Sequence, residues 1–265
     1  FVYIIVYHKK SFFTRNLLTN QLKKPIINIS NRPKENKEDC SMPRTQLKDR
    51  ALPTYSRGEE IFNMVSHIAG GALGIAGIVL CIIFSALHKN VYAVVSSSVF
   101  GGTLILLYTM SSIYHGLKPE TTAKRVFQII DHCSIFLLIA GTYTPLSLCT
   151  LREYNPVTGW TIFGIIWGVA ILGIVLNAID LKQFRLFSII CYLVMGWCII
   201  IKGAVLPQLL HTGGFVLLLS GGACYTFGAV LYVLGKSHKW LHSIFHVLCV
   251  FGSVLHIMCI MLYVV

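Results

Sequence analysis

From Ile61 onward, the chain alternates between long apolar runs and short polar loops. Each run approaches the roughly 20 residues that a helix needs to cross about 30 Å of hydrocarbon. The pattern therefore predicts an all-α integral membrane protein, built as a bundle of seven transmembrane helices. The predicted spans are residues 61–86, 91–115, 127–149, 159–179, 186–206, 213–235 and 241–264.

The composition agrees with a membrane protein. Of the 265 residues, 55% are hydrophobic and 12% are charged, and the mean hydropathy is +0.71. A soluble domain carries about twice that charged fraction, and so much apolar surface could not be buried in a single core of this size. Eight of the nine cysteines lie inside the apolar runs and none forms a C-x-x-C pair, so we interpret them as packing residues.

The first 58 residues differ from the rest of the chain. They hold twelve Lys or Arg and four Asp or Glu, a net charge of +8, together with several prolines and no sustained periodicity. We predict a basic, disordered tail at residues 1–58, ahead of a membrane domain at residues 59–265. Met42 stands just before the change in composition, and we hypothesise that residues 1–41 are not part of the native protein. Tryptic peptides from upstream of Met42 would contradict that hypothesis.

The charges of the short loops predict the orientation of the helices, because cytoplasmic loops carry an excess of Lys and Arg. With a cytoplasmic N-terminus, seven such residues fall on the inner side and three on the outer side. We therefore expect a multi-pass protein of the cell membrane, with its N-terminus in the cytoplasm and its C-terminus outside. Since loop position accounts for this charge, we expect no nucleic-acid partner. The inner residues are Lys118, Lys124, Arg125, Lys182, Arg185, Lys236 and Lys239, and the outer residues are Lys89, Arg152 and Lys202.

Polar residues within or beside the spans gather near one face of the membrane. Counted at 1.5 Å per residue from the flanking loop cations, His115 lies about 5 Å deep and Asp131 about 9 Å deep. In the predicted orientation this face is the cytoplasmic one. Ionisable groups inside a membrane are costly and mark functional sites, so we expect one polar site here. Its candidate residues are Asn63, Ser66, His67, Ser111, His115, Asp131, His132, His242 and His246.

The spacing of three histidines is typical of a metal site. His242 and His246 are four residues apart and share a helix face, and His115 comes from another span at a matching depth. Three imidazoles with an open fourth position form the ligand set of a catalytic zinc site. Asp131 is the only carboxylate inside any predicted span, so it is placed to orient or deprotonate a water molecule at that open position.

A simpler interpretation stays open for these histidines. A His pair at a membrane face can be interfacial, with its nitrogens hydrogen-bonded to the backbone or to lipid headgroups. The presence of His115 and Asp131 at the same depth favours the metal site. We expect no ligand role for the other histidines, and we interpret Pro145 as a kink stabilised by neighbouring hydroxyls. These other histidines are His88, His132, His211, His238 and His256.

Several segments together resemble a known family. They are Glu59-Glu-Ile-Phe-Asn-Met-Val-Ser-His67, Ser111-Ser-Ile-Tyr-His115, Asp131-His-Cys-Ser with Ala140-Gly-Thr-Tyr-Thr-Pro145, and His242-Ser-Ile-Phe-His246. In this order and in these spans, they are similar to the bacterial hemolysin III family, within a larger group that includes progestin and adipoQ receptors and alkaline ceramidases. The resemblance covers residues 59–265.

The resemblance implies a seven-helix fold with a cytoplasmic N-terminus and a zinc ion held by His115, His242 and His246. It also implies that Asp131 acts through the water molecule at the open zinc position, and that Ser111 lies beside it. As supporting residues of the site we predict Asn63 and His67.

Three functions are compatible with the sequence. The first is a zinc-dependent, ceramidase-like hydrolase of a lipid amide, in which a membrane lipid is the substrate, Asp131 takes a proton from water and Ser111 hydrogen-bonds the oxyanion. The second is a cytolysin or pore, although the spans contain no repeating polar stripe. The third is a receptor-like protein of lipid homeostasis, in which a lipid is the ligand and the zinc only braces the helix ends. We favour the first, and the sequence leaves the oligomeric state open.

Overall fold

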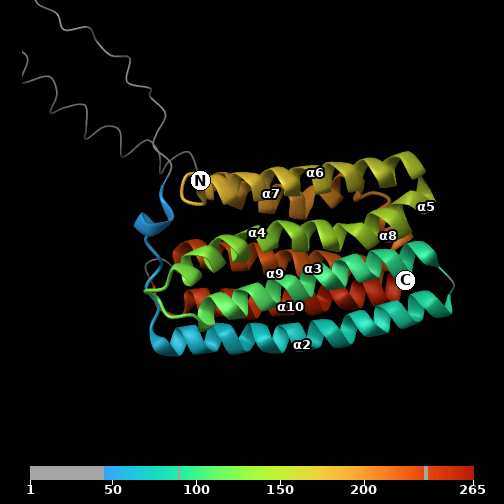
Figure 1. The fold of residues 1–265 in the computed structure, drawn as a ribbon. Helices are drawn as coiled ribbons and strands as arrows, with labels where there is room; N and C mark the ends of the chain where they lie inside the picture. Colours follow the sequence, from blue (N-terminus) through green and yellow to red (C-terminus); the bar gives the residue numbers. More distant parts are fainter. Residues whose placement is uncertain (1–44, 89, 236–237) are drawn as a thin grey trace, which may run out of the picture. The chain divides into compact units, whose positions relative to one another are not determined.

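A computed structural model describes residues 45–88, 90–235 and 238–265, and within them seven long helices run side by side (Figure 1). Each span is long and apolar enough to cross a membrane, which confirms the predicted all-α, seven-helix fold. The long helices are α2 (Arg57–Leu87), α3 (Val91–Gly116), α4 (Thr122–Pro145), α6 (Pro156–Asp180), α7 (Arg185–Trp197), α9 (His211–Leu234) and α10 (Leu241–Tyr263). The short elements are η1 (Leu47–Asp49), η2 (Leu146–Leu151), α5 (Arg152–Tyr154), η3 (Cys198–Lys202) and α8 (Leu206–Leu209).

Side-chain caps determine where several helices begin. At α2, the Ser56 hydroxyl accepts the N–H of Glu59, and the Glu59 carboxylate accepts the N–H of Ser56. This capping box satisfies donors that the first turn of a helix leaves free. The first span therefore begins at Arg57, ahead of the predicted boundary at Ile61. Similar caps at the starts of α3, α4 and α6 are provided by Asn90, Thr121 and Asn155.

The third span is longer than predicted at both ends, and it stays helical beyond Pro145 as the prediction required. Proline has no N–H to donate to the carbonyl one turn earlier, and the chain continues through the π-helical turn η2 into α5. The hydroxyls of Thr142 and Thr144 donate to carbonyls one turn before them. Such local adjustments satisfy the backbone around a proline in a membrane helix. The span covers Thr122–Tyr154 instead of residues 127–149.

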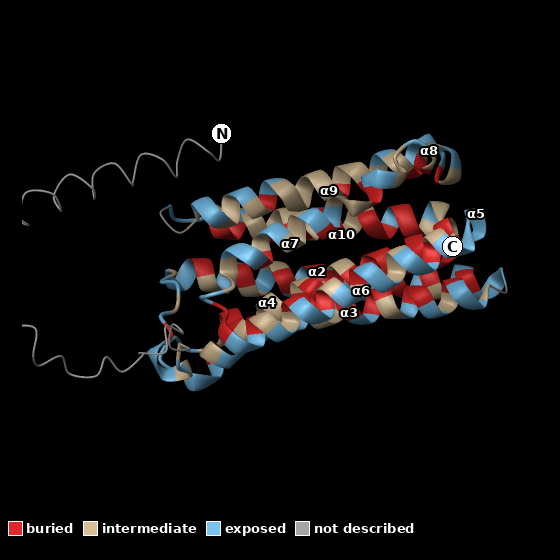
Figure 2. Ribbon diagram, turned by 90° about the horizontal axis from the view of Figure 1, so that it is seen from above, coloured by how far each residue is buried: buried red, intermediate tan, exposed pale blue. Residues whose placement is uncertain are grey.

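The long helices pack as neighbours around an apolar interior. α2 lies against α3 and α10, α3 lies against α4, α4 lies against α6, and α9 lies against α10. Figure 2 shows buried residues along the inward faces and exposed residues along the outward ones. One end of the bundle is called the site end here: α2, α4, α7 and α10 begin there, and α3, α6 and α9 end there.

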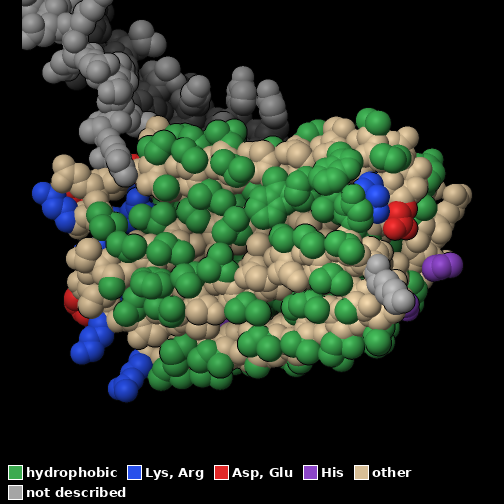
Figure 3. Space-filling model, turned by 45° about the vertical axis from the view of Figure 1, so that its right-hand side comes forward, with side chains coloured by type: hydrophobic (Ala, Val, Ile, Leu, Met, Phe, Trp, Pro, Cys, Tyr) green, Lys and Arg blue, Asp and Glu red, His purple; other side chains and the backbone are tan. Residues whose placement is uncertain are grey.

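Large apolar side chains cover the outside of the bundle. Leu172, Val194 and Phe227 are 51%, 65% and 68% exposed, which is the arrangement expected for helices that face lipid. In Figure 3, hydrophobic side chains extend along the flank, and most of the visible Lys and Arg side chains lie at one end. The prediction that the site end faces the cytoplasm rests on the loop charges.

A segment before α2 crosses the site end. Of the predicted N-terminal tail, residues 1–44 lie outside the described residues, whereas residues 45–56, called the strap here, contact the bundle. Within the strap, η1 packs against α4, and the N–H of Thr45 donates to the Asp180 carboxylate at the end of α6, at 2.8 Å. Pro53 and Tyr55 line an internal cavity. The strap therefore covers part of the site end.

α2 and α10 approach each other closely at Gly77. A Cβ atom at this position would lie 2.5 Å from Cγ2 of Ile257 on α10, which is far inside normal contact distance. Small residues at such crossings let helix backbones come together in lipid. The contact between α2 and α10 therefore depends on the missing side chain.

We predict that Gly77→Leu lowers the stability of the bundle by about 1–3 kcal/mol, because overpacking forces the two helices apart. Thermal unfolding of the purified protein in detergent measures the effect. Gly102→Leu on α3 is the matched control, because a Cβ there would meet nothing within 4 Å. Equal losses of stability in the two variants would contradict the prediction.

Candidate metal centre and cavity

A cavity of about 190 Å³ lies inside the bundle. It is lined by residues of α2, α3, α4, α7, α9 and α10, together with the strap. Along α10 it extends from His242 to His256, which corresponds to about 21 Å of helix. Its walls are mostly apolar, as at Leu107, Leu138 and Leu218, whereas several polar side chains meet at the site end. The cavity thus has one polar end and a long apolar remainder.

Three histidines converge at the polar end. His242 and His246 lie one turn apart in the first two turns of α10, and His115 lies in the last turn of α3. The Nε2 atoms of His242 and His246 are 3.0 Å apart, and one ring nitrogen of each histidine lies within 4.8 Å of those of the other two. The structure therefore brings together the three predicted ligands.

The geometry and burial of these histidines fit a metal ion. Ligand nitrogens about 2.0–2.1 Å from a tetrahedral zinc lie roughly 3.3 Å from one another, and the 3.0 Å between the Nε2 atoms of His242 and His246 is close to that separation. His115, His242 and His246 are 3%, 8% and 1% exposed. Within the described residues, Nε2 of His115 has no hydrogen-bond partner. A buried imidazole lone pair without a donor is the group that a metal ion would satisfy.

Glu60 orients His115, the candidate metal ligand on α3. Its Oε2 atom lies 2.6 Å from Nδ1 of His115, and its Oε1 atom accepts a hydrogen bond of 2.6 Å from the Lys124 ammonium. Lys124 is 1% exposed and also donates to the carbonyl of Leu117. Because the carboxylate accepts at Nδ1, the other ring nitrogen of His115 keeps its lone pair for a metal. This is the carboxylate–histidine arrangement that orients metal ligands.

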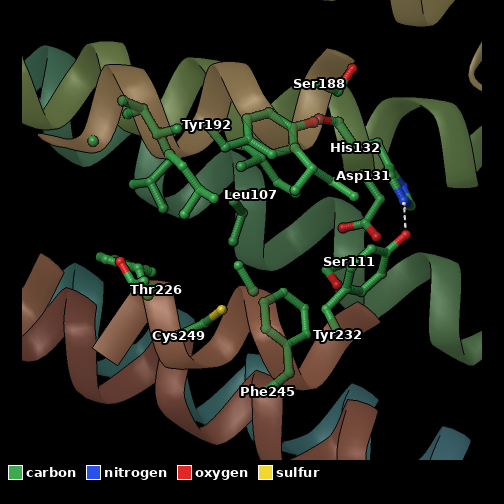
Figure 4. Close-up of a pocket in the computed structure, with 18 of the residues that line it drawn as sticks. Leu107, Ser111, Asp131, His132, Ser188, Tyr192, Thr226, Tyr232, Phe245 and Cys249 are labelled. Atoms are coloured by element: carbon green, nitrogen blue, oxygen red, sulfur yellow. Dashed lines mark hydrogen bonds between the residues drawn. The ribbon is translucent and has the colours of Figure 1, made fainter. Parts of the chain in front are cut away.

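Asp131 and Ser111 border the same cavity. Figure 4 shows the Asp131 carboxylate, from α4, and the Ser111 side chain, from α3, directed to one region of the cavity. The two side chains interact, and His115 is also near the carboxylate. Asp131 is not part of the three-histidine cluster. Asp131 therefore lies beside the cluster without belonging to it.

His132, next to Asp131 in sequence, has other partners. Its Nδ1 atom donates to the carbonyl of Gln128 at 2.9 Å, so its Nε2 atom accepts from the Tyr232 hydroxyl at 3.1 Å. The Tyr232 oxygen in turn accepts from the Arg185 guanidinium at 3.2 Å. The bond between His132 and Tyr232 is drawn in Figure 4. This chain joins α4, α9 and α7 at the site end.

Tyr55 of the strap covers one histidine. Its ring stacks on that of His242 with a centroid distance of 4.7 Å and an interplanar angle of 16°. It also lies 5.8 Å from the His115 ring. Burial raises the pKa of the Tyr55 phenol, so the hydroxyl stays protonated at neutral pH. Tyr55 thus presents a hydrogen-bond donor at the polar end of the cavity.

The predicted supporting residues lie on α2 beside the cluster. His67 packs against His246 with ring centroids 3.9 Å apart, and Asn63, one turn earlier, is fully buried. His67 is not one of the three clustered histidines. Of the others, His256 donates to the carbonyl of Leu218 through Nε2 at 3.2 Å. His88, His211 and His238 are exposed.

Sequence reasoning missed Glu60 and Tyr55. Glu60 fell outside the predicted first span, yet the capping-box pattern of Ser56 and Glu59 is a start signal that places Glu60 in the first turn of the helix. Tyr55 belongs to a segment interpreted as a tail, and its contact with His242 joins residues far apart in the sequence. No local pattern in the sequence signals that contact.

Comparison with known proteins places the chain in a family. The Haemolysin-III related family matches residues 55–257. Hemolysin-3 from Bacillus cereus is 39% identical over 206 residues, which are 78% of this chain and 92% of that protein. A Hemolysin-3 homolog from Bacillus subtilis (strain 168) is 38% identical over 207 residues, 78% and 95% of the two chains. With seven apolar helices and this match, the chain is a multi-pass membrane protein and belongs to the Haemolysin-III related family.

Proposed function

We propose that this protein is a zinc-dependent hydrolase that cleaves an amide bond in a membrane lipid. The observation that carries the proposal is the convergence of three buried histidines, a carboxylate and a hydroxyl at the polar end of one cavity. An apolar cavity inside a membrane protein suits lipid tails, and the polar end suits the bond between tail and headgroup. The proposed orientation places this end near the cytoplasmic face.

His115, His242 and His246 would hold the zinc ion through one ring nitrogen each. Bound zinc supplies a Lewis acid that polarises the amide carbonyl and lowers the pKa of water to about 7. The imidazole donor set suits zinc, and three protein ligands leave a position for the reaction. Glu60 keeps Nδ1 of His115 protonated, so that its Nε2 atom stays available.

Asp131 would act as the general base and then as the general acid. Its carboxylate accepts a proton from the attacking water, whose oxygen bonds to the amide carbon. When the carbon–nitrogen bond breaks, Asp131 returns that proton to the leaving nitrogen, so that the products are a fatty acid and an amine. The Ser111 hydroxyl, which lies against Asp131, donates a hydrogen bond to the oxyanion that forms in between.

A receptor-like role with a structural metal is the alternative that the same geometry allows. The three histidines join the end of α3 to the start of α10, so a metal there would brace two helices. In that case, removing a ligand would loosen the bundle, and removing Asp131 would alter no reaction. Comparison of turnover with thermal stability in the same variants distinguishes the two roles.

The names of the Bacillus relatives raise lysis as a further activity. Under our proposal, lysis would follow from lipid turnover and would need Asp131. Leakage from lipid vesicles that persists with purified Asp131→Ala protein would favour a direct pore instead.

We predict that His115→Ala protein loses its zinc and its lipid-amide hydrolysis together. Metal content by mass spectrometry and fatty-acid release from a panel of lipid amides measure the two properties. His211→Ala is the matched control, because His211 is exposed and lies at the start of α9, at the opposite end of the bundle. Loss of zinc with full retention of activity in His115→Ala would rule out the proposed role of the metal.

For Asp131→Asn, we predict a fall in turnover of about 10²- to 10⁴-fold, because the amide cannot accept the proton from water. Zinc content and thermal stability should stay close to those of the wild type, since Asp131 is not a ligand. Wild-type turnover in this variant would remove Asp131 from the mechanism.

For Glu60→Gln, we predict zinc binding that is about 10- to 100-fold weaker, because the amide no longer holds His115 as the carboxylate does. The affinity is measured by competition with a chelating dye. Glu153→Gln is the matched control, since Glu153 is exposed, pairs with Arg152 on α5 and lies at the opposite end of the bundle. Equal zinc affinities in the two variants would contradict a role of Glu60 at the metal site.

A further inference from the structure

A cluster of buried polar atoms lies between α2 and α10. Asn63, His67 and Ser243 are 0%, 3% and 2% exposed. Within the part of the chain that the structure describes, both polar atoms of the Asn63 amide, both ring nitrogens of His67 and the Ser243 hydroxyl have no hydrogen-bond partner. Buried polar groups in proteins are nearly always hydrogen-bonded to protein or to ordered water. These five atoms therefore point to an occupant that links them.

The helix geometry brings these groups to one depth. Glu59 accepts a 2.7 Å hydrogen bond from the N–H of Trp240, which sets the starts of α2 and α10 level. Counted from that bond at 1.5 Å per residue, Asn63 lies about 6 Å along α2 and Ser243 about 4.5 Å along α10. Each residue also shares a helix face with a ring of the next turn, since Asn63 precedes His67 by four and Ser243 precedes His246 by three.

The two faces meet at the rings themselves. His67 and His246 have ring centroids 3.9 Å apart with an interplanar angle of 37°. The Tyr108 ring of α3 also packs against His67, at a centroid distance of 5.0 Å and nearly perpendicular to it. The polar cluster therefore lies among α2, α3 and α10, next to His246, and borders the cavity at His67.

His246 itself needs a partner at this place. Its Nε2 atom faces Nε2 of His242 at 3.0 Å, on the side of the proposed metal. A neutral imidazole that binds a metal through Nε2 carries its hydrogen on Nδ1. That Nδ1 atom is buried and has no partner among the residues described. Metal-binding histidines nearly always donate this second N–H to an acceptor, and the acceptor orients the ring.

The polar groups on α2 and α10 can supply the acceptor only through a bridge. No direct hydrogen bond joins them to Nδ1 of His246 in the described residues. A buried water molecule typically makes about three hydrogen bonds to such groups, and the Asn63 amide oxygen, the Ser243 hydroxyl and Nδ1–H of His246 offer a suitable set. An amide, a hydroxyl and an imidazole around one water satisfy donors and acceptors together.

We infer that Asn63, Ser243 and His67, linked by buried water, form a hydrogen-bonded shell that orients His246 as a zinc ligand. The inference rests on the proposed zinc site and adds residues that position a ligand without touching the metal. In this arrangement Glu60 orients His115 of α3 directly, and Asn63 orients His246 of α10 through water. α2 thus controls two ligands while contributing none itself.

The test is zinc affinity together with the visible spectrum of the cobalt-substituted protein, which reports the geometry of the ligands. For Asn63→Leu, we expect zinc binding that is about 10- to 100-fold weaker and a shifted cobalt spectrum. For Asn63→Asp, a carboxylate replaces the amide as acceptor, and we expect affinity at or above that of the wild type. This rescue separates an orienting role from a purely structural one.

Asn177→Leu is the matched control. Asn177 is a fully buried asparagine on α6 that is hydrogen-bonded to Ser188 and Tyr192. Its replacement should lower thermal stability and leave both metal readouts unchanged. If Asn63→Leu does not fold, Ser243→Ala, a small change near the start of a helix, replaces it with the same expected direction.

The outcomes separate the two proposals. Wild-type protein that binds neither zinc nor cobalt at the three histidines would overturn the proposed zinc site, and this inference with it. Wild-type metal binding, with unchanged affinity and spectrum in Asn63→Leu and Ser243→Ala, would overturn the inference alone.

Discussion

The carboxylate of Glu60 joins a buried lysine to a buried histidine, and the candidate metal centre depends on that connection. Lys124 is 1% exposed, and a buried ammonium is strongly destabilising unless it is paired. One oxygen of Glu60 pairs with it, and the other fixes His115 with Nδ1 as the donor. Three helices are thereby tied together, because the residues come from α2, α3 and α4. The carboxylate that satisfies this buried charge also leaves Nε2 of His115 as the nitrogen available to a metal.

Glu59, next to Glu60, also accepts hydrogen bonds through its carboxylate, but its donors are backbone N–H groups at the starts of two helices. Glu59 closes the capping box of α2 and accepts the N–H of Trp240 at the start of α10. It therefore sets the longitudinal position of α10 relative to α2, and with it the depth of His242 and His246. Two consecutive residues thus act on the cluster. Glu59 sets the level of α10, which carries His242 and His246, and Glu60 orients His115.

Hydropathy was enough to predict the seven spans, and the depth of the histidines followed from counting residues to the loop cations. These properties are local in sequence. The lateral order of helices is not, and the contacts that depend on it escaped prediction: Glu60 with Lys124 across 64 residues, and Thr45 with Asp180 across 135. Asn63 and His67 were placed at the correct end, but only the packing of α2 on α10 shows that they lie next to His246. The depth of a residue in the membrane can be counted along the sequence, whereas its neighbours on other helices depend on how the helices pack.

The polarity of the cavity explains how one site could serve a lipid amide. Beyond the histidines the cavity lining is largely apolar and includes Leu107 and Leu218. An acyl chain that lay there would be removed from water, which is favourable. The amide bond would then reach the polar end, where Asp131 and Ser111 are. On the far side of that bond lies the strap, whose Tyr55 stacks on His242. Pro53 and Tyr55 of the strap line this end of the cavity, so a headgroup held there would contact the strap.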